Sequence, residues 1–276
     1  MGGEGVGHHA EGFTGLTSGR WNVVLREGMR GAFRAPEFAD PERLAASGDP
    51  CFRGRGRPCR VALPGGGSGV LRVYRHGGML RAITGRRFLG VPRPLDELRA
   101  TEAARRAGVR VPEVLAAWYR FVGKVFHEGW ILTREIEGAT DLLTALSGGS
   151  APPRIFRALG EETRKMHDAG VWHADLHVKN VLLTGDEVTI IDFDRARVTD
   201  EVSRDARIGN LLRFDRSVAK LGRSGVRVPA KDRMRFFHGY RKEAVSRGER
   251  AEILRRCERS LRMHARGWSL FGTGRS

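Results

Sequence analysis

The sequence predicts an α+β protein whose two halves are built differently. From about residue 21 to 135, short apolar and β-branched runs alternate with glycine-rich turns, which is typical of strands. After a break at 137–140, apolar residues recur at helical spacing. The 276 residues suffice for one large domain or two lobes. We therefore expect a small antiparallel sheet with one helix, followed by a mainly helical half.

The first half contains a predicted hairpin and a single helix. The runs "CRVALP" (59–64) and "GVLRVYR" (69–75) predict strands, and the "GGGS" between them predicts a flexible loop. In 95–108, Leu95, Leu98, Ala103 and Ala107 recur at helical spacing, and Gly108 is a plausible stop. Residues 111–136 resume strand character, with aromatic and β-branched side chains.

The second half predicts helices around two short strands. One helix begins at "DLLTAL", and another covers 152–170, with Pro153 near its start and Gly170 past its end. The strands "VLLTG" and "EVTIID" follow, and then a helical segment from about 203 to 266. We expect a flexible N-terminal tail over 1–20, an N-lobe over 21–137 and a C-lobe over 138–276.

The chain is strongly basic, with a formal net charge of +17. Nearly all of the positive residues are Arg rather than Lys. A GC-rich genome explains this choice of residue but does not explain the excess of positive charge. From Arg227 to the end, 14 Arg or Lys stand against five Asp or Glu, about half of the net charge. A basic surface attracts nucleic acid, anionic lipid headgroups or phosphorylated substrates, and charge alone does not choose among them.

The cysteines and the termini indicate a cytoplasmic protein. Cys51, Cys59 and Cys257 have no metal-ligand spacing, so we expect free thiols in a reducing compartment. The N-terminus lacks the apolar region of a signal peptide, and no window of 18 apolar residues predicts a membrane span. We interpret His8 and His9 as part of a polar chain end rather than as metal ligands.

The densest polar cluster is "VWHADLHVKN" (171–180). His173, Asp175 and Asn180 have the H-x-D-x-x-x-x-N spacing of a kinase catalytic loop. In such a loop Asp175 accepts the proton of the attacking hydroxyl, Asn180 binds a metal ion, and His173 braces the loop. The alternative is a polar surface loop. His177 and Lys179 have no assigned role.

A second acidic motif, "VTIIDFDRAR" (188–197), follows a predicted strand. Asp192 comes 12 residues after Asn180, a separation that suits a hairpin bringing both to one Mg²⁺ ion. Asp194 stands where protein kinases have the Gly of D-F-G. It is expected either to reinforce the metal site or to bond to its own loop backbone.

Three further features occur in the order that a kinase uses. Gly54 and Gly56 precede a strand and are candidates for a phosphate cradle, although G-x-G is a weak signal. Arg72 takes the place of the phosphate-pairing cation, with Arg75 as its rival. Glu97, at the front of the first helix, is placed to pair with Arg72. The alternative is that these charged residues are merely solvated.

Taken together, these motifs resemble the lipopolysaccharide core kinases. The resemblance rests on four stretches in the same order, within about residues 50–215: "VLRVYRHGGML", "ELRATEAARRAGVRVPEV", "MHDAGVWHADLHVKNVLL" and "VTIIDFDRAR". It is closest to the 3-deoxy-D-manno-octulosonic acid (Kdo) kinases, and the heptose kinases are similar but less close. His177 departs from the Asn that the family often has there.

The resemblance implies a bilobal protein-kinase-like fold, ATP and Mg²⁺ as cofactors, and phosphoryl transfer to a hydroxyl of Kdo in the lipopolysaccharide inner core. It implies Asp175 as catalytic base, Asn180 and Asp192 as metal ligands, and Arg72 with Glu97 as the phosphate-pairing couple. The implied substrate is an anionic glycolipid of the Kdo-lipid A type. The implied location is cytoplasmic, peripheral on the inner membrane, with contact through the basic surface.

Other functions fit less well. A compact protein Ser/Thr kinase needs a long activation segment, whereas only 84 residues and no A-P-E motif follow Asp192. A pseudokinase is disfavoured because Asp175, Asn180 and Asp192 are all present. We do not expect nucleic-acid binding, because no stacking platform or reader motif accompanies the basic C-terminus. The oligomeric state cannot be predicted from the sequence.

Overall fold

A computed structural model describes residues 10–50, 58–75, 85–222, 225–226, 228–241 and 255. Its contacts divide the chain into two compact units. The first comprises Met1–Arg106, Val111–Glu137 and Phe193–Val198. The second comprises Ala107–Arg110, Gly138–Asp192 and Thr199–Ser276. The chain therefore passes from the second unit to the first at the peptide bond between Asp192 and Phe193, inside the predicted D-F-D motif.

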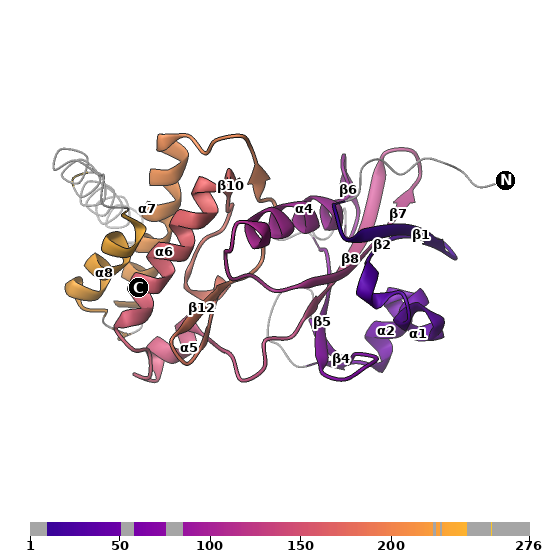
Figure 1. Ribbon diagram of the computed structural model, residues 1–276, viewed down its shortest axis with the longest axis horizontal. Helices are drawn as coiled ribbons and strands as arrows, with labels where there is room; N and C mark the ends of the chain where they lie inside the picture. Colours follow the sequence, from indigo (N-terminus) through magenta and orange to yellow (C-terminus); the bar gives the residue numbers. More distant parts are fainter. Residues whose placement is uncertain are drawn as a thin grey trace, which may run out of the picture. The chain divides into compact units, whose positions relative to one another are not determined.

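The first unit is built on one antiparallel sheet with the strand order β1-β2-β7-β8-β5-β4-β3, and β6 also pairs with β8 (Figure 1). The strands are β1 (Phe13–Ser18), β2 (Trp21–Arg26), β3 (Asp49–Pro50), β4 (Cys59–Ala62), β5 (Ser68–Val73), β6 (Phe88–Leu89), β7 (Val114–Val122) and β8 (Phe126–Arg134). The predicted β4–β5 hairpin is confirmed, with Ala62 opposite Ser68. Gly65, Gly66 and Gly67 all have positive φ in its turn, which glycine adopts without steric cost.

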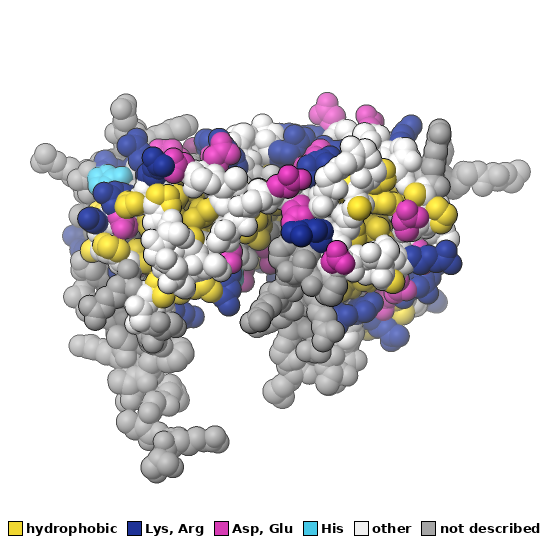
Figure 2. Space-filling view, turned by 90° about the horizontal axis from the view of Figure 1, so that it is seen from below, with side chains coloured by type: hydrophobic (Ala, Val, Ile, Leu, Met, Phe, Trp, Pro, Cys, Tyr) yellow, Lys and Arg dark blue, Asp and Glu magenta, His cyan; other side chains and the backbone are white. Residues whose placement is uncertain are grey.

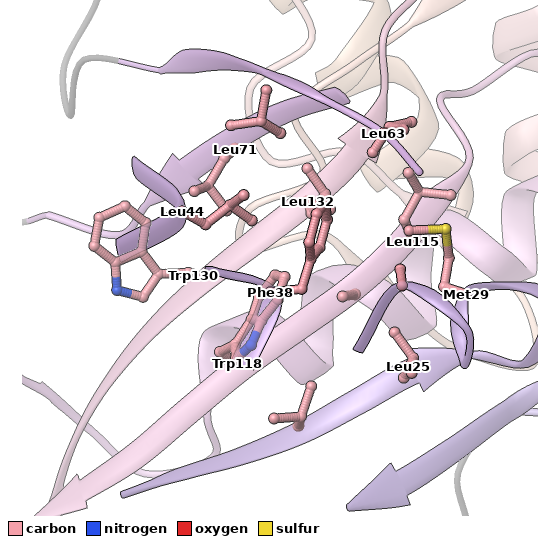
Figure 3. Packing of buried hydrophobic residues seen from close by; sticks show 14 of the residues in the cluster. Leu25, Met29, Phe38, Leu44, Leu63, Leu71, Leu115, Trp118, Trp130 and Leu132 are labelled. Atoms are coloured by element: carbon pink, nitrogen blue, oxygen red, sulfur yellow. The ribbon is translucent and has the colours of Figure 1, made fainter. Parts of the chain in front are cut away.

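Alternating side chains give this sheet two buried faces. One face packs with the 3-10 helices η1 (Glu27–Met29) and η2 (Ala32–Arg34) and with the short helices α1 (Pro36–Ala39) and α2 (Pro41–Ser47). Figure 3 shows Phe38 and Leu44 of these helices beside Trp118, Trp130 and Leu132 of the sheet. Burial of these large apolar side chains is the main force that holds the unit together.

The other face of the sheet is covered by α4 (Arg93–Arg106). Leu98 of α4 is buried against Val24, Ile131 and Tyr119 of three different strands. The helix begins very close to β8, since a Cβ on Gly129 would lie 2.2 Å from Pro94 Cγ. Glycine at position 129 thus permits the approach that holds the N-terminus of α4 against the sheet.

Two predictions for the N-terminal region are wrong. Residues 13–18 were expected in a flexible tail, yet they form β1 and pair along their full length with β2. Their burial explains the difference, because Phe13 packs under α4 while the strand completes the sheet edge. The helices α1 and α2 fall in a region predicted as strands and turns. Pro36 and Pro41 at their first turns were the available sequence signals.

The second unit is mainly helical, as predicted. Its helices are α5 (Leu142–Ser147), α6 (Arg154–Asp168), η3 (Val178–Asn180), α7 (Arg204–Leu221) and α8 (Ala230–Tyr240). Its strands β9 (Thr140–Asp141), β11 (Val181–Thr184) and β12 (Glu187–Ile190) form a small sheet in the order β12-β11-β9. Two further short strands are β10 (Val171–Trp172) and β13 (Arg197–Val198), the latter belonging to the first unit. The helical segment predicted over 203–266 appears as two helices, since α7 ends at Leu221 and α8 begins at Ala230, and most of its end lies outside the described residues.

Charged side chains of both signs cover the described surface. On the face shown in Figure 2, Lys and Arg side chains lie among Asp and Glu side chains rather than in one continuous field. Many of them pair, as Arg60 does with Glu135 through Nε at 2.7 Å. None of the helices in the described segments has the length and apolar character needed to cross a bilayer.

Candidate active site

In the first unit, Glu97 of α4 contacts the side chains of Arg72 in β5 and of Tyr74, the residue that follows this strand. Arg72 Nη2 forms an ion pair with one carboxylate oxygen of Glu97, and the hydroxyl of Tyr74 donates to the other. Arg72 also lies over the ring of Tyr74, with its guanidinium carbon 5.1 Å from the centroid. The side chain of Glu97 is only 5% exposed, so its charge depends on these two donors. The Arg72–Glu97 pair expected from the sequence is therefore present.

Tyr74 is a partner that the sequence analysis missed. Burial, followed by the negative charge of Glu97, raises the pKa of Tyr74 well above its ordinary value, so the phenol is a hydrogen-bond donor at neutral pH. The available signal was the period of two in "LRVYR", which places Arg72 and Tyr74 on one side of the strand. Arg75 lies beyond the end of β5 and is exposed, which favours Arg72 over its rival as the paired cation.

In the second unit, the loop 173–180 presents Asp175 to solvent. The side chain of Asp175 is 57% exposed. Its Oδ2 lies 3.3 Å from His177 Nε2, and its Oδ1 lies 3.7 Å from Arg213 Nη1 of α7. The Nδ1 of His177 accepts from the Lys179 N–H at 3.2 Å, so the ring proton lies on Nε2, facing Asp175. His177, which had no role assigned from the sequence, therefore contacts Asp175, the predicted base.

His173 is buried inside the loop. Its Nδ1 accepts from the Asp175 N–H at 3.1 Å, so its Nε2 carries the proton and donates to the Ile191 carbonyl at 3.1 Å. Burial lowers the pKa of His173, while the Ile191 carbonyl and the nearby acids Asp192 and Asp175 act in the opposite direction. Because both ring nitrogens bind backbone groups, the geometry supports a positioning role for His173 rather than proton transfer.

A buried side-chain cluster anchors this loop to the helices of the second unit. Asn210 of α7 donates to the His173 carbonyl at 2.8 Å and accepts from its N–H at 3.3 Å. His167 of α6 contacts Asn210 at 3.1 Å and the Tyr240 hydroxyl at 2.8 Å. Sequence analysis missed this cluster, although a polar Asn210 beside the apolar positions of α7 was a signal for a buried hydrogen-bonding role.

The hairpin β11–β12 brings Asn180 and Asp192 to the same end. Val181 pairs with Ile190, and the Ile191 N–H donates to the Asn180 carbonyl at 3.0 Å, so the two residues flank the last rung of the ladder. The Asn180 amide nitrogen donates to the Asp175 carbonyl at 3.0 Å, which leaves the amide oxygen as the atom suited to a cation. The predicted hairpin is therefore confirmed.

The donor set at this end of the hairpin fits Mg²⁺. One carboxylate and one amide oxygen are hard ligands, and Mg²⁺ commonly takes only one or two protein carboxylates together with phosphates and water. No group of three His, Cys, Asp or Glu side chains in the described residues forms a ready-made metal site.

Asp194, for which two roles were open, has an ion pair with Arg93, the first residue of α4. The two atoms Arg93 Nη1 and Asp194 Oδ2 are 3.1 Å apart. Gly54 and Gly56 lie outside the described residues, as do His8, His9, Cys51 and Cys257. Cys59 is a buried free thiol.

Comparison with known proteins agrees with these motifs. Residues 52–240 match the sequence model of the lipopolysaccharide kinase (Kdo/WaaP) family. A 3-deoxy-D-manno-octulosonic acid kinase from Vibrio cholerae is 34% identical over 157 residues, covering 55% of this chain and 66% of that relative. One from Stenotrophomonas maltophilia is 32% identical over 223 residues, covering 78% and 86%. The chain spans slightly less than two thirds of the Vibrio cholerae relative and 61% of a Vibrio vulnificus one.

Two solved structures share the fold. The protein described as WaaP in complex with acyl carrier protein superposes with a TM-score of 0.54 at 20% identity, covering 86% of this chain and 98% of that one. The amicoumacin kinase hAmiN superposes with a TM-score of 0.52 at 12% identity, covering 86% and 96%. These likenesses confirm the predicted α+β protein-kinase-like fold.

Proposed function

Since the chain belongs to the lipopolysaccharide kinase (Kdo/WaaP) family, we propose that it is an ATP-dependent kinase that phosphorylates a sugar hydroxyl of Kdo in the lipopolysaccharide inner core. The observation that carries the proposal is the geometry of the loop 173–180. It exposes the Asp175 carboxylate, while partly buried hydrogen bonds fix the backbone N–H and carbonyl of the same residue.

In this proposal each residue of the loop has a separate role. Asp175 accepts the proton of the acceptor hydroxyl as the oxygen attacks phosphorus, which requires an accessible carboxylate in a fixed position. His177 and Arg213 contact its two oxygens and hold its orientation. His173 is a positioning residue, because it acts through the backbone of Asp175 and Ile191.

Nucleotide and metal binding are assigned to two sets of residues, one in each unit. Arg72, held by Glu97 and Tyr74, provides a positive charge for the nucleotide phosphates. Asn180 and Asp192 are the residues that would hold Mg²⁺, which when bound neutralises charge on the phosphates. Gly54 and Gly56 remain candidates for the phosphate cradle.

The proposed substrate is an anionic glycolipid of the Kdo-lipid A type, at the cytoplasmic face of the inner membrane. The basic character of the chain supports this, because a positive protein is attracted to anionic headgroups. A peripheral contact of this kind needs no membrane-spanning helix.

The test is phosphoryl transfer from labelled ATP to a Kdo-lipid A precursor with Mg²⁺. We expect transfer by the wild type and a loss of about 10²- to 10⁴-fold in kcat for Asp175→Asn, since general-base catalysis contributes that much. Asp192→Asn should lose turnover together with Mg²⁺-dependent nucleotide binding, which Asp175→Asn should keep. Unchanged thermal unfolding of both variants is the control for folding.

Two results would contradict the proposal. Transfer to a heptose-containing acceptor but not to Kdo would move the chain to the heptose kinases, and transfer only to a protein acceptor would reject a glycolipid kinase altogether. A rate for Asp192→Asn within a few-fold of wild type would show that the metal assignment is wrong.

A further inference from the structure

Arg93 is fixed at the N-terminus of α4 by contacts on several sides. Its guanidinium carbon lies 4.0 Å from the ring centroid of the buried Phe88, and its backbone N–H donates to His127 Nε2 at 3.1 Å. Its Nη1 reaches Asp194 Oδ2 at 3.1 Å, and the two side chains are only 20% and 25% exposed. An ion pair with this little exposure and a stacked guanidinium is screened less than a surface pair.

The segment that Arg93 holds has an unusual backbone. Asp192 has φ 65° and Arg195 has φ 63°, and they are the only described non-glycine residues with positive φ. L-residues in this left-handed region are disfavoured, and they persist only where the surroundings hold them. Phe193, between them, is buried, and its carbonyl accepts from the Ala196 N–H at 2.9 Å. The backbone of the segment 192–195 must therefore be held by contacts with its surroundings. The ion pair between Asp194 and Arg93 of α4 is one such contact.

The same helix face carries both this ion pair and the pair with Arg72. Arg93 and Glu97 are four residues apart, one turn along one side of α4. Glu97 binds Arg72, and Arg93 binds Asp194. A shift of α4 would consequently move Glu97, the partner of Arg72, and Arg93, the partner of Asp194, together.

We propose that Arg93 is a positioning residue that clamps Asp194 and thereby fixes the backbone of Asp192, two residues earlier, for metal binding. The inference rests on the proposed function for the role of Asp192, and it assigns Asp194 as an anchor rather than as a metal ligand. It gives Asp194 a role that the sequence left open, since Asp194 Oδ2 forms an ion pair with the Arg93 guanidinium.

The test compares Arg93→Gln, Asp194→Asn and the double variant with wild type. The first readout is the affinity for a non-hydrolysable ATP analogue with and without Mg²⁺. We expect each single change to lower the Mg²⁺-dependent part of the affinity by about 10- to 100-fold, as is typical when a residue that orients a ligand is lost. The double variant should lose no more than either single variant, because both changes remove one interaction.

The second readout is amide hydrogen exchange in the apo protein. Exchange at residues 192–196 should be faster in Arg93→Gln than in wild type, whereas Arg93→Lys should restore part of the protection. The matched control is Arg99→Gln on the same helix. Arg99 pairs with Asp96 at 3.6 Å in an exposed position, so its loss should change neither readout.

Three outcomes would overturn the clamp. Loss of Mg²⁺-dependent binding in Asp194→Asn but not in Arg93→Gln would make Asp194 a ligand. If the losses of Mg²⁺-dependent affinity add up in the double variant, Arg93 and Asp194 act independently of each other. A lower melting temperature with unchanged Mg²⁺ dependence would leave only a structural role. Since neither readout uses the acceptor, failure of transfer to Kdo-lipid A would reject the proposed function without deciding the clamp.

Discussion

Glu97 is a buried glutamate of α4, as is Glu102 later on the same helix. Glu97 accepts from Arg72 and Tyr74 at once, and the adjacent Leu98 of α4 is buried in the core beneath that helix. A lone helix glutamate is usually a surface acid, so the sequence could suggest this role only through the order of motifs. The alternation in "LRVYR" places Tyr74 on the same side as Arg72, but its contact with Glu97 also requires α4 to pack against this side, which depends on the tertiary structure.

The first prediction at this scale concerns Glu97→Gln. The neutral side chain should leave Arg72 without its ion-pair partner, and hydrogen bonds to charged groups contribute roughly 1.5–3 kcal/mol. We therefore expect kcat/KM for ATP to fall by about 10- to 100-fold. Tyr74→Phe is the matched control, since it removes a donor to Glu97 but keeps the ion pair. A larger loss in Tyr74→Phe than in Glu97→Gln would show that Arg72 is not positioned by Glu97.

The second prediction concerns pH and His167. Burial lowers the pKa of His167 from 6.5 to about 4, although the bond to Asn210 acts in the opposite direction. The folded-state pKa thus lies below the unfolded value. Between pH 6.5 and pH 4 the unfolded chain binds more protons, so stability falls as pH falls through this window and levels off below it.

Urea unfolding at pH 7 and pH 5 measures this effect. The His167 contribution should be about 2 kcal/mol between these two pH values, from 1.36 kcal/mol per pKa unit. His167→Gln should be less stable at pH 7 but should show a smaller loss on acidification. An equal loss in wild type and His167→Gln would mean that His167 is not held neutral in the fold.

At the scale of elements, α6 and α8 cross closely, and both contribute side chains to the buried cluster that anchors the loop 173–180. The crossing depends on two glycines. A Cβ on Gly160 would lie 2.1 Å from the Phe236 carbonyl oxygen, and one on Gly239 would lie 1.9 Å from the Arg157 carbonyl oxygen. Both contacts are with backbone, which cannot rotate away. The sequence shows these glycines inside helical patterns but does not show which helices they bring together.

The third prediction follows from that crossing. Gly160→Ala and Gly239→Ala should each destabilise the protein by about 1–3 kcal/mol, because overpacking outweighs the better helix propensity of Ala. Gly209→Ala on α7 is the control, since a Cβ there meets nothing within 4 Å. This variant should gain up to about 1 kcal/mol in the free energy of unfolding. A stabilising Gly160→Ala would contradict the close crossing.

At the scale of the whole molecule, charge is the dominant property. The net charge of +17 reflects 49 Lys and Arg residues against 32 Asp and Glu residues. Many of the described Arg side chains nevertheless form ion pairs, such as Arg60 with Glu135 and Arg134 with Glu113. About half of the excess falls in the segment from Arg227 to the end, and slightly more than half of that share belongs to residues outside the described ones. The attraction to anionic surfaces can therefore be predicted from composition, although the surface that makes the contact cannot.

The fourth prediction tests this attraction with vesicles. The protein should bind vesicles containing anionic phospholipid at low salt, and binding should fall by at least about tenfold at high salt, since each basic residue near the surface contributes about 1 kcal/mol and is screened. Vesicles of neutral phospholipid are the control. Equal binding to neutral vesicles, or binding that does not change with salt, would contradict electrostatic adsorption.

The local features of this protein were determined by its sequence. The spacing from His173 through Asp175 to Asn180, the hairpin that returns to Asp192 and the long helices all depend on residues a few positions apart, so short-range patterns predicted them. The alternation in β5 likewise placed Arg72 on the side of the strand that faces α4.

The partners of these residues were decided only by the tertiary structure. Asp194 binds Arg93, which precedes it by 101 residues, and His173 is held by Asn210, 37 residues later. Residues 13–18, predicted as a flexible tail, form a strand because they pair with β2 and bury Phe13 in the cluster that contains Leu98 of α4. These contacts depend on burial and on close packing between segments that are distant in the sequence. Such packing exists only in the folded chain, so short-range patterns do not predict it.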